Sequence, residues 1–264
     1  TTYRLTEKGI GLVAIERLDQ EESRIPASSV LEALGLVVGY EDLKDALAFA
    51  VEARSRTNFL LEGPPACAKS VLLEGIRAAV PDAYMAFGSR TSAAGLSDAL
   101  FEYHPSVLLL DEADKMSNDV YSVLLGLMES GEVLETKSKK TRGIQLNTTV
   151  LAACNSSDRM PQAFLSRFAL HARFPLYTRV EFINVCRGFL RAEGCPEEFA
   201  VAIGQRVYDY GLGDVRKARG VWAMMRESTE TEVVRVVNLM LRYSGDLQKA
   251  GRRVEPSGER LEGM

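Results

Sequence analysis

The chain has 264 residues, of which 46% are apolar and 26% charged, and its 32 basic and 36 acidic residues give a formal net charge of −4. The length corresponds to about two domains, and the composition is that of a globular protein, which excludes collagen, coiled-coil and disordered classes. No apolar run approaches the ~20 residues of a membrane-spanning helix, so we expect no membrane association. Because the net charge is slightly negative, any binding of nucleic acid would need a local basic patch.

The cysteines argue against a zinc site and against a disulfide scaffold. They lie at positions 67, 154, 186 and 195, without the C-x-x-C spacing typical of metal sites. We therefore expect a reducing, cytoplasmic location. The chain begins with Thr1 rather than Met, as a piece of a longer protein would.

Residues 1–36 are interpreted as an N-terminal extension. Tyr3–Gly9 is strand-like, and Ile10–Leu18 has helical spacing of its apolar residues. The first of these segments resembles the last strand and following helix of winged-helix DNA-binding domains, and the alternative is a plain extension. Ser28 or Ser29 is expected to cap a short helix that Gly35 ends.

From residue 37 to residue 176, short apolar runs alternate with amphipathic segments of helical length, which predicts an α/β domain with a parallel five-stranded sheet flanked by helices. The predicted strands are Asn58–Glu62, Ala83–Phe87, Val107–Leu110, Thr148–Cys154 and Leu170–Phe174. The predicted helices are Glu41–Ser55, Ser70–Val80, Ser92–Tyr103 and Asn118–Ser130. Residues 177–244 show helical spacing only and predict a smaller all-helical domain, followed by a polar tail at 245–264.

The segment between the first strand and the next helix has the pattern of a phosphate-binding loop. Its residues are Gly63, Pro64, Pro65, Ala66, Cys67, Ala68, Lys69 and Ser70. Backbone N–H groups of such a loop, together with the positive end of the helix dipole, bind nucleotide phosphates. We expect Lys69 to reach the terminal phosphates and the Ser70 hydroxyl to bind Mg²⁺. The usual pattern has glycine where Ala68 stands and often where Ala66 stands, and alanine costs about 1–2 kcal/mol in a left-handed conformation.

A second motif follows some forty residues later. The apolar strand Val107–Leu110 leads into the adjacent carboxylates Asp111 and Glu112. Asp111 is placed to hold Mg²⁺ through water, and Glu112 is placed to polarise the attacking water.

Together the two motifs resemble those of the AAA+ ATPases, over residues 37–243. The resemblance implies a P-loop NTPase core with a helical lid, ATP and Mg²⁺ as cofactors, and a homo-oligomeric ring that we expect to be hexameric. It implies that Val38 and Gly39, with Val37, border the adenine.

The same resemblance assigns three further polar residues. Asn155, just after a strand, matches sensor 1, which orients the lytic water. Arg167, in Ser166-Arg167-Phe168, matches the arginine finger that acts on the neighbouring subunit. Arg216 matches sensor 2 at the start of a lid helix.

Residues 131–146 predict a β-hairpin with a basic tip. The tip carries Lys137, Lys139, Lys140 and Arg142. The hairpin resembles the one before sensor 1 in the RuvB-like, MoxR-like and MCM branches of AAA+ proteins. Such basic side chains can follow a phosphate backbone without reading its sequence. The alternatives are a solubilising hairpin or a surface for a protein partner.

The sequence therefore predicts an ATPase that remodels or moves along a polymer, with RuvB-like action on DNA as the first hypothesis. A MoxR-like protein-remodelling chaperone, with a protein substrate or adaptor at the hairpin, is the second. A slow, nucleotide-dependent assembly switch is the third, which the two loop alanines favour.

Overall fold

The computed structural model describes residues 15–17, 25–37, 39–53, 56–137 and 140–243. The chain divides into two compact units, Thr1–Leu176 and Tyr177–Met264, which are treated separately below.

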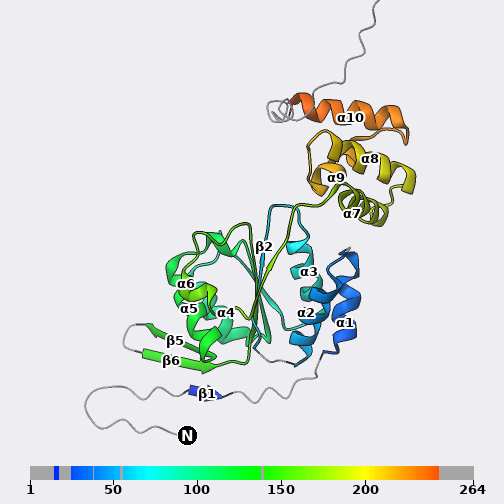
Figure 1. Ribbon diagram of the computed structural model, residues 1–264. Coiled ribbons are helices and arrows are strands. Elements are labelled where there is room, and N and C mark those ends of the chain that lie inside the picture. Colours follow the sequence, from blue (N-terminus) through cyan, green and yellow to red (C-terminus); the bar gives the residue numbers. More distant parts are fainter. Residues whose placement is uncertain (1–14, 18–24, 38, 54–55, 138–139, 244–264) are drawn as a thin grey trace, which may run out of the picture. The chain divides into compact units, whose positions relative to one another are not determined.

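The first unit contains the predicted parallel sheet (Figure 1). In spatial order its strands are β3 (Tyr84–Phe87), β4 (Val107–Asp111), β7 (Thr149–Cys154), β2 (Phe59–Glu62) and β8 (Leu170–Arg173). Each neighbouring pair is parallel. The strand ends differ from the predicted ones by one residue, and the predicted α/β fold class is confirmed.

Helices cover both faces of this sheet (Figure 1). One face carries α1 (Ala27–Ala33), α2 (Glu41–Ala53) and α3 (Lys69–Ala79), and the other carries α4 (Ala93–Tyr103), α5 (Asn118–Glu129) and α6 (Gln162–Leu165). In β4, Leu108 and Leu110 belong to the buried cluster under α4 and α5, whereas Leu109 belongs to the cluster under α1 to α3. Successive side chains of a strand point to opposite faces, so an unbroken apolar run supplies both cores.

The start of α1 differs from the prediction. The helix begins at Ala27 with Pro26 in the N-cap position, so Ser28 and Ser29 lie within its first turn and do not cap it. Pro26 has extended backbone angles and its carbonyl accepts the N–H of Ser29 over 3.0 Å, so the helix begins before the serines and without a side-chain cap. The 3₁₀ turn η1 (Leu34–Leu36) follows the helix.

The predicted β-hairpin is present and joins a second, small sheet. Its strands β5 (Glu132–Lys137) and β6 (Lys140–Gln145) pair antiparallel, and β6 also pairs in parallel with β1 (Ile15–Arg17). The helical interpretation of Ile10–Leu18 is therefore wrong for these three residues. An edge strand offers unpaired N–H and C=O groups, and an extended segment can satisfy them where a helix cannot. Tyr3–Gly9 lies outside the described residues.

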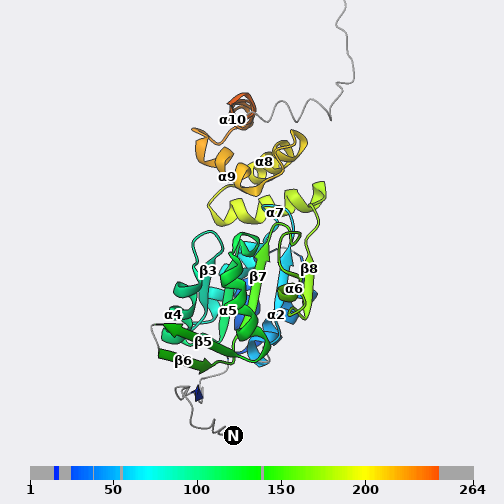
Figure 2. The same cartoon turned by 90° about the vertical axis from the view of Figure 1, so that its left-hand side faces the viewer.

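The hairpin leads directly into the central strand β7, as Figure 2 shows. Close to the start of β7, the Thr148 hydroxyl donates to the carbonyl of Pro105 over 2.7 Å, and the N–H of Thr149 donates to the carbonyl of Ser106 over 2.9 Å. The base of the hairpin is thus attached to the amino end of the main sheet.

The second unit is helical. Its helices are α7 (Arg179–Ala192), α8 (Glu197–Asp209), α9 (Val215–Met224) and α10 (Glu230–Tyr243). Thr178 and Glu181 form a capping box at the start of α7, and a separate buried cluster holds the four helices together. The tail at 245–264 lies outside the described residues. Within the described part of the chain, no helix has both the length and the apolar character needed to span a bilayer.

Candidate functional site

The phosphate-loop motif connects β2 to α3, with the N-terminus of the helix at its end. The helix begins at Lys69, one residue earlier than predicted. Ala66 has φ of 67° and Ala68 has φ of 60°, with Cys67 between them. Left-handed residues alternating with ordinary ones turn successive N–H groups to one side, which makes an anion-binding concavity. The loop therefore fits a phosphate group, and both alanines occupy conformations that favour glycine.

Gly63 is required by the tight approach of a neighbouring segment. A Cβ atom at this position would lie 2.6 Å from the carbonyl oxygen of Phe174. The Phe174 ring packs against the ring of Tyr40, with centroids 4.7 Å apart. The segment predicted to border the adenine, with buried Val37 and with Gly39 at φ of 82°, therefore lies next to a residue that touches the loop. Val38 lies outside the described residues.

Within the loop, the prolines and the cysteine play different parts. Pro65 is exposed, and the carbonyl of Pro64 accepts a hydrogen bond from Lys69. The Cys67 side chain is 3% exposed and belongs to the core under α1 to α3, with its Sγ 3.6 Å from the carbonyl oxygen of Pro175. Cys67 thus anchors the loop to the chain beyond β8.

The Lys69 ammonium is buried inside the loop. Its Nζ donates to the carbonyls of Gly63 and Pro64, each over 2.7 Å. Burial lowers the pKa of Lys69, and Asp111 and Asp114 are among the groups that oppose this shift. An ammonium has three donors and these carbonyls take two, so the arrangement fits a phosphate oxygen as the third partner.

Asp111 and Glu112 lie at the carboxyl end of β4. Oδ1 of Asp111 accepts the N–H of Glu112 over 2.8 Å, and Glu112 has φ of 53°. The Glu112 carboxylate lies 2.6 Å from Nζ of Lys115 and accepts a hydrogen bond from the Ser89 hydroxyl over 3.2 Å. The Lys115 hydrogen bond and charge lower the pKa of Glu112, which keeps this carboxylate ionised.

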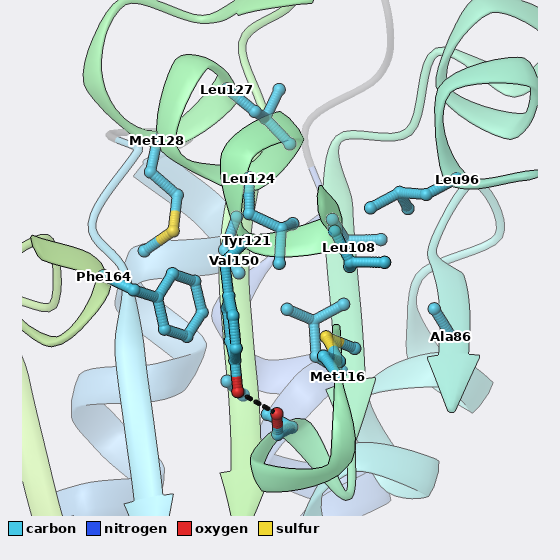
Figure 3. Close-up of a cluster of buried hydrophobic side chains, with 14 of the residues drawn as sticks. Ala86, Leu96, Leu108, Met116, Tyr121, Leu124, Leu127, Met128, Val150 and Phe164 are labelled. Atoms are coloured by element: carbon cyan, nitrogen blue, oxygen red, sulfur yellow. Dashed lines mark hydrogen bonds between the residues drawn. The ribbon is translucent and has the colours of Figure 1, made fainter. Parts of the chain in front are cut away.

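Two contacts hold the turn that carries Glu112. A Cβ atom on Gly88 would overlap the carbonyl of Glu112, so a glycine is needed there. The Tyr121 hydroxyl donates to the carbonyl of Ala113 over 2.6 Å, and Figure 3 shows this bond at the edge of the buried cluster. Burial raises the pKa of Tyr121 to about 12, so the phenol remains a donor at neutral pH.

Asn155 follows β7, which lies between β2 and β4. Its backbone N–H donates to Oδ1 of Asp114 over 3.4 Å, and its side chain is exposed. The structure therefore brings the phosphate loop, the Asp111–Glu112 pair and Asn155 to one edge of the sheet, where three parallel strands end.

The residues present also fit a magnesium ion bound largely by nucleotide. Ser70 is exposed at the start of α3. Asp111 ends β4, which lies two places from β2 in the sheet, with β7 between them. Among the described residues, no group of three or more His, Cys, Asp or Glu side chains could hold a metal ion by itself. Mg²⁺ commonly uses one or two protein oxygens together with phosphates and water.

Arg167 follows α6 and contacts its own subunit. Its Nη2 lies 3.0 Å from Oε2 of Glu129, and Nη1 donates to the Ser166 hydroxyl over 3.2 Å. Within the described part of the chain, Nε of Arg167 is a buried atom without a hydrogen-bond partner.

Arg216 belongs to the second unit, at the start of α9. Its side chain is 72% exposed and pairs with Asp214, which also caps the helix by accepting the N–H of Arg216. Its predicted role as sensor 2 stays a prediction, as do the roles of Asn155 and Arg167.

The hairpin residues differ in their surroundings. Arg142 is held by Glu135 across the hairpin and by Asp98 of α4, and its guanidinium lies 4.1 Å from the centre of the Phe101 ring. Lys139 and the side chains of Lys137 and Lys140 lie outside the described residues.

Sequence reasoning did not find three residues near the site, which are Glu62, Lys115 and Ser89. Glu62, at the end of β2, accepts hydrogen bonds from the N–H and hydroxyl of Ser157. One of its oxygens lies 2.5 Å from Nε2 of His171. Burial raises the pKa of Glu62, but the bonds from Ser157 and His171 outweigh it and the pKa is lowered overall.

The signals for these residues are uneven. Glu62 is a charged residue at the end of an apolar strand, which indicates a site, and Lys115 stands three residues after Glu112, a spacing at which side chains meet on a helical turn. For Ser89 the sequence holds no such signal, because its partner is 23 residues away.

Comparison with known proteins agrees with this geometry. Residues 59–176 match the family model of the "ATPase family associated with various cellular activities (AAA)". The fold is similar to structures of RuvB from Thermotoga maritima. A RuvB point variant aligns with a TM-score of 0.60 and 18% identity over 77% of this chain and 70% of that one. The structure described as the RuvB "Holliday junction branch migration motor" aligns with a TM-score of 0.57 and 18% identity over 76% and 70%.

Curated relatives are more similar in sequence but much longer. The DNA replication licensing factor mcm2 of Xenopus laevis is 27% identical over 57% of this chain and 21% of its own length. MCM4 of Arabidopsis thaliana is 30% identical over 47% of this chain and 18% of its own length. The chain thus spans about a fifth of these relatives. Residues 59–176 therefore match the AAA family model, and the fold of the first unit and the geometry of the site agree with that match.

Proposed function

We propose that this protein hydrolyses ATP with Mg²⁺ in a ring of identical subunits and uses the energy to move along DNA. The observation that carries the proposal is the path of β7. One end of this strand continues from the basic hairpin and the other leads into Asn155, so a single six-residue strand links the polymer-facing element to the site. At ~3.3 Å per residue the strand spans about 20 Å.

The roles of the residues follow from their chemistry. The loop amides and Lys69 bind the phosphates, and Ser70 and Asp111 hold Mg²⁺, which neutralises charge on the phosphates when bound. The Glu112 carboxylate accepts a proton from the attacking water, and Asn155 orients that water. Arg167 of the adjacent subunit supplies positive charge where negative charge develops.

The hairpin lysines supply the contacts to DNA. Lys137, Lys139 and Lys140 carry three positive charges at the tip, and such contacts bind phosphates without reading bases. Arg142 has a structural part, since Glu135 and Asp98 already neutralise it.

A slow nucleotide-dependent switch is the second candidate, and the loop backbone favours it. Ala66 and Ala68 both have positive φ, which costs free energy that glycine would not. If this strained backbone must also rearrange when nucleotide binds, the affinity would be modest and the turnover slow, as a switch requires.

The deciding experiment measures ATP hydrolysis alone and with single-stranded, duplex and four-way DNA. Stimulation by DNA, absent in Lys69→Ala, supports the DNA-translocating function. If the protein hydrolyses ATP steadily but does not bind DNA, and DNA does not change the rate, a MoxR-like protein remodeller would be favoured instead. Hydrolysis slower than assembly and disassembly of the ring would favour the switch.

A further inference from the structure

The side chain of Asn58 joins two segments that the proposed function uses. Asn58 immediately precedes β2 and is 3% exposed. Its Oδ1 accepts the N–H of Val150 in β7 over 2.9 Å, and its Nδ2 donates to the carbonyl of Arg167 over 3.2 Å. Its own carbonyl accepts the N–H of Ala169 over 2.9 Å. One buried amide therefore contacts the strand that ends at Asn155 and the residue assigned as the arginine finger.

These contacts are costly to lose. A buried amide must be hydrogen-bonded on both its N–H and C=O sides, and a buried partner left unpaired costs free energy. The amide of Asn58 also has a direction, since Val150 requires an acceptor and Arg167 requires a donor. Asparagine satisfies both with one side chain.

Apolar contacts also hold the helix that precedes Arg167. Phe164 is fully buried and packs against Tyr121 and Phe168 with centroid distances of 4.9 Å in both pairs. Figure 3 shows the Phe164 ring among the core side chains of α5. These rings hold α6 against the core, while the Asn58 bond acts on the Arg167 backbone itself. The guanidinium contacts of Arg167, with Glu129 and Ser166, are exposed by comparison.

We infer that Asn58 is a positioning residue that aims Arg167 at the nucleotide of the neighbouring subunit and ties its position to the β7 strand. The inference rests on the proposed function, because it needs Arg167 to act between subunits. It predicts that loss of the Asn58 amide weakens catalysis in the neighbour while its own nucleotide site still binds ATP. A misplacement of about 1 Å can cost about 100-fold in rate, so we expect a reduction of that order.

Mixed assemblies of full-length subunits test this. Lys69→Ala subunits have a defective loop but an intact finger, and Arg167→Ala subunits have the reverse, so mixing them should restore hydrolysis at some interfaces. Asn58→Leu, which has a similar size but no hydrogen bonds, should be rescued by Lys69→Ala subunits and not by Arg167→Ala subunits. Its affinity for ATP should match that of the wild type.

Thr148→Val is the matched control. Thr148 is also buried and its hydroxyl also bonds a backbone carbonyl, that of Pro105, but no hydrogen bond of its side chain involves Arg167. Loss of this one bond should lower thermal stability, by less than loss of the two bonds of Asn58, and leave hydrolysis near wild type. If the Asn58→Leu chain does not fold, Asn58→Ser, which shortens the side chain but keeps a polar group, takes its place in the same mixtures.

Each other outcome overturns the inference. Wild-type turnover in the Asn58 variant, rescue by Arg167→Ala subunits, or failure of both partners to rescue it would show that Asn58 does not position the finger. If Lys69→Ala and Arg167→Ala fail to complement while the wild type hydrolyses ATP, the assignment of the finger is wrong and the inference falls with it, whereas the ATPase proposal stands. A wild type that neither binds nor hydrolyses ATP would refute the proposed function itself.

Discussion

The ammonium of Lys115 lies 2.6 Å from the carboxylate of Glu112, the residue proposed as the catalytic base. Both side chains are partly exposed, at 47% and 38%, so the ion pair is screened by water. The ion pair with Lys115 fixes the position of the Glu112 carboxylate and lowers its pKa, which opposes protonation. Water and Lys115 thus compete for the same oxygens.

Replacing Lys115 by alanine should therefore raise turnover, by at most roughly fivefold because exposed ion pairs are weak. Affinity for ATP should change little. Steady-state kinetics at low and high salt measure the effect, and the difference between variant and wild type should shrink as salt screens the pair. A loss of turnover in Lys115→Ala would mean that the pair orients the base rather than competing for it.

Lys69→Ala and Glu112→Gln should fail in different ways. The first removes the cation that binds phosphate, so ATP binding should be lost. The second keeps the shape of the side chain but cannot accept a proton, so ATP should bind normally and turnover should fall at least 100-fold. Binding and hydrolysis assays separate the two effects, and hydrolysis at the parent rate by Glu112→Gln would disprove the assignment of the base.

Glycine at Ala66 or Ala68 should stabilise the protein. Each alanine has positive φ, and relief of that strain exceeds the entropy that glycine adds to the unfolded chain, for a net gain of about 0.5–1 kcal/mol. ATP affinity should rise or stay the same. Thermal unfolding and nucleotide titration measure both.

Ala78→Gly, within the neighbouring helix α3, is the control for this comparison and should destabilise the protein by about 1 kcal/mol. A loop glycine variant that loses nucleotide binding would show that the alanine methyl groups make necessary contacts.

Glu62→Gln should lower stability by about 1 kcal/mol at neutral pH, because the carboxylate loses its charge-assisted bonds with Ser157 and His171. The folded-state pKa of Glu62 is below its usual value of 4.5. Its contribution is therefore fully present above about pH 4.5 and is lost as the pH falls through the folded-state pKa.

The melting temperatures of Glu62→Gln and wild type should accordingly differ above about pH 4.5 and converge as the pH falls through the folded-state pKa. Glu74→Gln, at an exposed position of α3, is the control and should track the wild type at every pH. A difference that persists undiminished well below pH 4.5 would contradict the carboxylate role.

Substitutions in the hairpin should distinguish side chains that bind DNA from a side chain that stabilises the fold. Replacing Lys139 and Lys140 by alanine should reduce the salt slope of DNA binding by about two and abolish stimulation of hydrolysis by DNA, with basal ATPase retained. Arg142→Ala should instead lower thermal stability and leave the slope unchanged, because Glu135 and Asp98 occupy that guanidinium. Equal slopes in all three proteins would rule out the lysines as the DNA contacts.

The sequence alone determined the sheet strands and the positions of the two main motifs. A short run such as Val107–Leu110 is typical of a strand buried on both faces, and a carboxylate pair directly after such a strand lies at its carboxyl end. The phosphate-binding loop before α3 consists of eight consecutive residues. Because these features depend only on residues adjacent in the chain, the sequence pattern predicts them.

Tertiary structure decided what those motifs touch and how their backbone is held. Asn58 and Arg167, and likewise Glu62 and His171, are 109 residues apart, and only the pairing of β2 with β7 and β8 brings them together. The positive φ of Ala66 and Ala68 arises because the path of the loop into α3 overrides the local preference of alanine. The strand at Ile15–Arg17 exists because β6 offers an edge to it. In each case the deciding free energy comes from partners distant in the chain, which residue spacing does not encode.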